Sequence, residues 1–77
     1  MKKLNLAIAK AVVKYRQLSQ LSQEELADLA DIHRTYVSQI ERGIKTPSVA
    51  VLFSISKALG VNPSHLVSEI ESIYNEI

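Results

Sequence analysis

The stretch SQEELADLADIHRTYVSQIERG, residues 22–43, decides the fold of this chain. Ser22, followed three residues later by Glu25, is the pattern of a capping box, in which each residue's side chain accepts a hydrogen bond from the other's backbone amide. The apolar pattern breaks near Asp31 and resumes at residue 33 or 34. It ends at Gly43, which readily takes the left-handed geometry of a helix C-terminus. The stretch therefore predicts two short helices joined by a tight turn.

The second of these helices has two chemically different faces. With an advance of about 100° per residue, Tyr36, Val37 and Ile40 fall on one apolar face, and Glu41 lies at its edge. The opposite face is polar but holds no acid; it consists of Arg34, Thr35, Ser38, Gln39 and Arg42. An ordinary solvated face usually mixes acids with bases. Arginine, glutamine and short hydroxyls are the side chains that read base edges in a major groove, so this face favours DNA binding over simple solvation.

The rest of the chain also has helical periodicity. No segment alternates apolar and polar residues with a period of two, so we expect an all-α, compact five-helix bundle. Ser48, after Pro47, and Asn62, before Pro63, are expected to start the fourth and fifth helices, and Gly60 to end the fourth. The expected inward residues are Leu4, Ile8, Ala11, Val12, Tyr15 and Leu18 in the first helix; Leu26, Leu29 and Ala30 in the second; and Leu52, Ile55, Ser56 and Leu59 in the fourth.

Length and composition bound the class of protein. The 77 residues, of which 47% are apolar and 22% charged, predict a single domain over residues 1–77. With no cysteine, a disulfide framework and a thiolate metal site are excluded. No window reaches the roughly 18 consecutive apolar residues of a membrane helix, and we expect a cytoplasmic protein. His33 and His65 lack acids at ligand spacing, and there is no glycine-rich phosphate loop, so neither a metal site nor an enzyme is expected.

The stretch from Leu21 to Gly43 closely resembles the helix-turn-helix of the phage-repressor/Cro-like family of DNA-binding proteins, which has the lambda-repressor-like fold. The resemblance continues through TPSVAVLFSISKALGVNPSHL and covers roughly residues 5 to 67. The resemblance rests on three motifs, SQEELA, IERG and ALGV, which occur at fixed spacing. Asp31 departs from it, since the family often has glycine there, but aspartate tolerates left-handed geometry. HRTY combined with ERG is further similar to the controller proteins of restriction–modification systems.

The resemblance implies roles for individual residues. Its expected base-reading residues are Arg34, Thr35, Ser38 and Gln39. Its expected phosphate contacts, which fix register without reading sequence, are Gln23, Tyr36, Arg42, Lys45 and Thr46. Two alternatives stay open for Tyr36, which either touches DNA through its ring or hydroxyl or only packs at the rim of the bundle.

The resemblance also pairs an arginine late in the first helix with the acid at the edge of the recognition helix. Arg16 and Glu41 occupy these positions, so we expect a salt bridge between the first and third helices. An unpaired carboxylate beside an apolar face would be costly, which favours this pairing. The alternative is two unrelated surface charges.

The fifth helix has more apolar residues than docking requires. Leu66, Val67 and Ile70 would suffice to dock it on the bundle. Small proteins seldom expose large apolar surfaces, so we expect a two-fold homodimer through helices four and five. Its expected interface residues are Phe53, Ile70, Ile73, Tyr74 and Ile77. The alternative is that these residues complete a small core. A dimer would set two recognition helices about 34 Å apart on a palindromic operator.

The leading hypothesis is a sequence-specific transcription regulator that binds double-stranded DNA, without a cofactor or small-molecule ligand. A restriction–modification controller, a phage or plasmid repressor and an antitoxin remain alternatives within this class. A controller would activate at low concentration and repress its own promoter at higher concentration, as the resemblance implies. A protein-interaction module that does not bind DNA is a second class. The expected location is the cytoplasm of a bacterium, in association with the nucleoid, whether the gene is bacterial or of phage origin.

Overall fold

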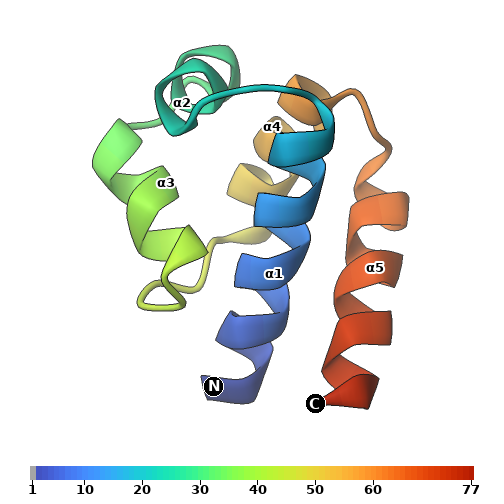
Figure 1. Cartoon of the computed structure of the whole chain (residues 1–77). Coiled ribbons are helices and arrows are strands. Elements are labelled where there is room, and N and C mark those ends of the chain that lie inside the picture. Colours follow the sequence, from blue (N-terminus) through green and yellow to red (C-terminus); the bar gives the residue numbers. More distant parts are fainter. Residues whose placement is uncertain (1) are drawn as a thin grey trace.

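The computed structural model describes residues 2–77, and this part of the chain forms five α-helices and no strand (Figure 1). The helices are α1 (Lys2–Leu18), α2 (Gln23–Ala30), α3 (Arg34–Glu41), α4 (Val49–Leu59) and α5 (Pro63–Glu76). The all-α five-helix prediction is confirmed. None of these helices is both long enough and apolar enough to cross a membrane.

The predicted helix starts are present. The Ser22 side chain accepts a hydrogen bond from the Glu25 amide at 3.0 Å, and the Glu25 carboxylate accepts one from the Ser22 amide at 2.8 Å. The Ser48 hydroxyl caps α4 by accepting a bond from the Val51 amide at 3.1 Å. Asn62 occupies the N-cap position of α5, before Pro63, but its side chain makes no capping bond.

Left-handed residues end α2 and α4, and another lies in the loop after α3. Asp31 ends α2 with φ 57° and Gly60 ends α4 with φ 75°. In the turn between α2 and α3, the Ile32 amide donates to the carbonyl of Ala27 at 3.0 Å. Gly43 follows α3 by two residues with φ 73°. The departure from glycine at position 31 is therefore accommodated by aspartate, as expected.

The core lies where all five helices meet. α1 and α5 pack side by side in opposite directions, and α2, α3 and α4 complete the bundle (Figure 1). Ser56 is fully buried, and its hydroxyl donates to the carbonyl of Leu52 at 2.7 Å, which satisfies the polar atom within its own helix. The buried apolar residues of the core are Ala7, Ile8, Ala11, Val12, Leu26, Ala27, Ala30, Val37, Ile40, Ile55, Leu59, Leu66 and Ile70.

Two leucines and a valine predicted to face inward are instead exposed. The buried face of α2 centres on Leu26, Ala27 and Ala30, which turns Leu29 outward and leaves it 62% exposed. Leu18 is the last residue of α1, where the chain turns away, and it too is mostly exposed. Val67 lies beside the docking stripe of α5 and is half-exposed. Sequence periodicity indicates the helices correctly but misplaces the edges of these faces.

Candidate nucleic-acid interface

The outer face of α3 carries the residues that the sequence predicts to read bases. Val37 and Ile40 fix the inner face, because both are fully buried in the core. On the opposite side Arg34 and Thr35 are exposed, and Ser38 and Gln39 are partly exposed. Tyr36 is half-buried and packs against the core, at the rim of the outer face. The structure therefore brings the four predicted base-reading residues together on one accessible surface.

A buried ion pair holds the carboxyl end of α3 against α1. Arg16 donates from Nε to Glu41 Oε2 at 2.7 Å and from Nη2 to Glu41 Oε1 at 2.9 Å. Its Nη1 donates to the carbonyl of Leu21 at 2.9 Å, in the connection to α2. The side chains of Arg16 and Glu41 are only 15% and 4% exposed. The hydrogen bonds to Glu41 raise the pKa of Arg16 above its ordinary value. The expected salt bridge is thus present.

Gln23 joins this ion pair. Its Nε2 donates to Glu41 Oε1 at 2.9 Å, so the carboxylate accepts three side-chain hydrogen bonds from two other helices. The same glutamine lines a surface depression with Ser22, Glu24, Arg16 and Arg34. The sequence does not predict this contact, because Gln23 and Glu41 are 18 positions apart and no local pattern links them. We call Arg16, Gln23 and Glu41 the Glu41 network.

The loop between α3 and α4 carries the other predicted phosphate contacts. Arg42 and Lys45 are exposed, and Thr46 donates from its hydroxyl to Asn5 Oδ1 on α1. That hydroxyl proton is already used, so a phosphate bond from it would require the bond to Asn5 to break. The ion pairs among residues 2–77 are Lys14–Glu69 and Arg16–Glu41. The cationic side chains of Arg34, Arg42 and Lys45 are therefore not neutralised by an acid in direct contact.

The predicted dimer surface needs one correction. Ile70 is only 6% exposed and packs in the core, so it has almost no side-chain area to offer a partner. Ile73 is partly buried against the same core. Phe53 on α4 is 57% exposed, and Tyr74 on α5 and Ile77, which follows that helix, are also accessible. The apolar surface that remains consists of Val49, Phe53, Val67, Tyr74 and Ile77.

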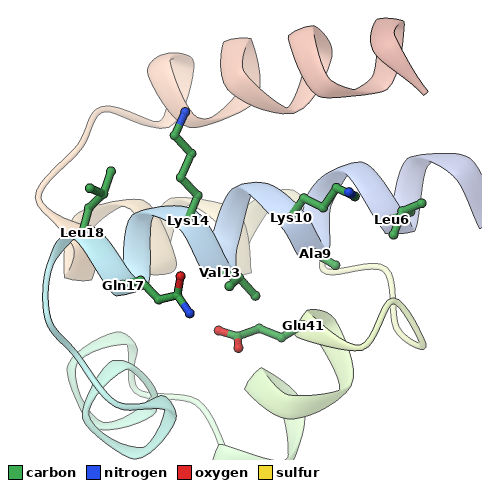
Figure 2. A pocket seen from close by; sticks show the side chains of 8 residues that line it. All are labelled: Leu6, Ala9, Lys10, Val13, Lys14, Gln17, Leu18 and Glu41. Carbon is green, nitrogen blue, oxygen red and sulfur yellow. The ribbon is translucent and has the colours of Figure 1, made fainter.

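A groove also runs along α1, opposite the carboxyl end of α3 (Figure 2). It is lined by Leu6, Ala9, Lys10, Val13, Lys14, Gln17, Leu18 and Glu41. The Glu41 carboxylate belongs to the ion pair with Arg16, and Lys14 is paired with Glu69 at 3.1 Å. Within residues 2–77 no three acidic, histidine or cysteine side chains lie close enough together to hold a metal ion. The groove therefore presents no cluster of reactive or metal-binding groups.

A short capped helix, α2, is followed by a tight left-handed turn and then by α3, which has a buried inner face and a basic outer face. These features define a helix-turn-helix protein. The chain belongs to the helix-turn-helix family, which it matches over residues 12–66.

Its relatives include control proteins. It is 53% identical over 49 residues to the control protein C.BamHI of Bacillus amyloliquefaciens, a match that spans 64% of this chain and 60% of that protein. It is 33% identical over 69 residues to the control protein C.SmaI of Serratia marcescens, over 90% of this chain and 81% of the relative.

A solved structure extends the likeness to three dimensions. The restriction–modification controller protein C.Esp1396I, as a tetramer in complex with its natural 35 base-pair operator, superimposes with a TM-score of 0.84. The two chains are 27% identical, and the match covers 92% of this chain and 93% of that one. The resemblance to the helix-turn-helix family and to controller proteins is confirmed.

Proposed function

We propose that this protein binds a double-stranded DNA operator and regulates transcription, with α3 in the major groove. The observation that carries the proposal is the outer face of α3, where Arg34 and Thr35 are exposed and the arginine forms no ion pair with an acid of the described residues. A guanidinium can bond guanine bidentately, and a glutamine such as Gln39 can bond adenine in the same way. The Glu41 network supports this role because it joins α3 to α1 and α2 in the absence of DNA.

The phosphate contacts are proposed on both sides of α3. Gln23 uses one N–H of its amide on Glu41, and the second N–H is proposed for a phosphate. Arg42 and Lys45 lie at the other end, beyond the carboxyl end of α3. Tyr36, at the rim, and Thr46, through its backbone, complete the proposed set. Contacts at both ends of a recognition helix would fix its register in the groove.

The active form is proposed to be a two-fold homodimer through α4 and α5. Val49 and Phe53 are one helical turn apart on α4, and both are more than half exposed. Tyr74 supplies apolar surface on α5, and Ile77 supplies more just beyond the end of that helix. Phe53→Ser is expected to shift a dimer toward monomer in sedimentation at micromolar concentration, because the contact loses most of its apolar area. Leu29→Ser, equally polar but on α2, is the matched control and should leave the assembly unchanged. A wild-type monomer under these conditions contradicts the proposed dimer.

Within the class of regulators, we propose a restriction–modification controller. The named relatives C.BamHI and C.SmaI and the structural likeness to C.Esp1396I support this assignment over a phage repressor or an antitoxin. The protein would act without a cofactor, a small-molecule ligand or an enzymatic reaction. Its place of action would be the operator, on the nucleoid in the cytoplasm.

Selection from a library of random duplexes tests the proposal. The expected outcome is a palindromic consensus whose half-sites lie about one helical turn apart, because two α3 helices of a dimer would enter successive major grooves. Binding without any consensus would contradict sequence-specific recognition. No binding at low salt would contradict DNA binding altogether.

A further inference from the structure

The amino end of α1 forms a surface depression together with the loop that follows α3. The depression is lined by Lys2, Lys3, Leu6, Arg42, Gly43 and Ile77. The bond from Thr46 to Asn5 joins the same two segments, and a Cβ on Gly43 would lie 3.9 Å from the Asn5 carbonyl oxygen. The first turn of α1 and the proposed phosphate-binding loop are therefore one continuous surface.

This surface gathers positive charge that the fold does not neutralise. Lys2 and Arg42 are exposed, neither belongs to an ion pair of the described residues, and no aspartate or glutamate lines the depression. Lys3 differs, because its Nζ lies 4.5 Å from the centre of the Tyr74 ring. Cations that line one depression repel one another, and an anion bound between them would reduce that repulsion.

The position of Lys2 at the start of α1 also favours an anion bound at this surface. The first turn of α1 holds no acid, although the partial positive charge of a helix start favours acidic side chains and opposes lysine. The charge of Lys2 therefore does not stabilise the start of α1, and its side chain is exposed. This arrangement fits a polyanion such as DNA, bound at Arg42 as proposed above.

We propose that Lys2 contacts a DNA backbone phosphate beyond those bound by Arg42 and Lys45, so that α1 lengthens the footprint of each subunit. This inference rests on the proposed DNA-binding function. The contact is to the backbone, so it adds affinity for every sequence and leaves base preference unchanged.

The test compares Lys2→Gln with the wild type on the duplex recovered from the random library, by fluorescence anisotropy at several salt concentrations. Loss of one phosphate contact per subunit is expected to reduce the slope of log K against log salt by about 0.9 per subunit. Lys10→Gln is the matched control, because it removes the same charge from an exposed site on the same helix, in the groove of Figure 2. It should leave the slope nearly unchanged.

Shortening the duplex flanks separates a direct contact from a general effect of charge. As the flanks are trimmed, the difference between the wild type and Lys2→Gln is expected to vanish before the consensus bases are reached. Equal slopes for the wild type and Lys2→Gln on the full duplex would overturn the inference while leaving DNA binding intact. Equal losses for Lys2→Gln and Lys10→Gln would overturn it as well. Failure of the wild type to bind any duplex would instead contradict the proposed function itself.

Discussion

The two sides of α3 use the same kinds of side chain for opposite purposes. On the inner side Arg16, from α1, donates hydrogen bonds to Glu41 and to the carbonyl of Leu21, and its side chain is 15% exposed. On the outer side Arg34 is exposed and belongs to no ion pair of the described residues. A satisfied, buried arginine fixes structure, whereas an accessible arginine with free donors can bind a ligand. The environment rather than the residue type therefore assigns the role.

Gln23 stands between the two sides, whereas Gln39 belongs to the outer side. One N–H of Gln23 donates to the carboxylate of Glu41 and the other is proposed above for a phosphate, while Gln39 lies on the outer face of α3. If the two sides are separate in function, changes on the inner side should reduce stability, and changes on the outer side should reduce DNA binding alone.

The largest effect is expected from Glu41→Ala. It leaves Arg16 buried without its carboxylate partner, and the loss of one partner of a buried pair destabilises a protein by about 3–5 kcal/mol. Urea unfolding followed by circular dichroism measures this free energy. Glu71→Ala, which removes an exposed acid on α5, is the control and should stay within about 0.5 kcal/mol of the wild type. A similar small change for both variants would show that the ion pair does not hold α3 in place.

The second-largest effect is expected from a change on the outer face of α3. Arg34→Ala is expected to weaken binding of the selected duplex by about 1–3 kcal/mol and to relax preference at one position of each half-site. Its unfolding free energy should remain within about 0.5 kcal/mol of the wild type, because its side chain is exposed. Anisotropy titrations against single-base variants of the duplex measure the first effect. Loss of stability equal to that of Glu41→Ala would abolish the contrast between the two sides.

The smallest effect is expected from Arg42→Ala. Its proposed phosphate contact is independent of sequence, so affinity should fall alike for the selected duplex and for unrelated duplexes. The slope of log K against log salt should fall by about 0.9 per subunit. Lys10→Ala, which removes an exposed cation from α1, should change neither quantity. A change in base preference for Arg42→Ala would place this residue among the base readers instead.

The sequence predicts what depends on local chemistry. The capping box of Ser22 and Glu25 and the left-handed Asp31 follow from residue types a few positions apart, and both are present. The ion pair between Arg16 and Glu41 was predicted through the resemblance to a family, since 25 residues separate the partners.

What depends on packing was harder to predict. The choice of which leucine of α2 faces the core depends on how closely Ala27 and Ala30 let other helices approach, and Leu29 was therefore misplaced. Ile70 was assigned to a dimer surface because periodicity alone does not separate a core stripe from an exposed one. The hydrogen bond from Gln23 to Glu41 depends on tertiary geometry that no local pattern contains.

The most direct test of the central claim is the change in backbone amide NMR shifts when the selected duplex is added to the protein. The largest changes are predicted at the outer face of α3 and at the start of α2, namely at Gln23, Arg34, Thr35, Ser38 and Gln39. The groove along α1 in Figure 2, at residues such as Val13, should change little. Large changes along that groove with an unperturbed α3 would contradict the account.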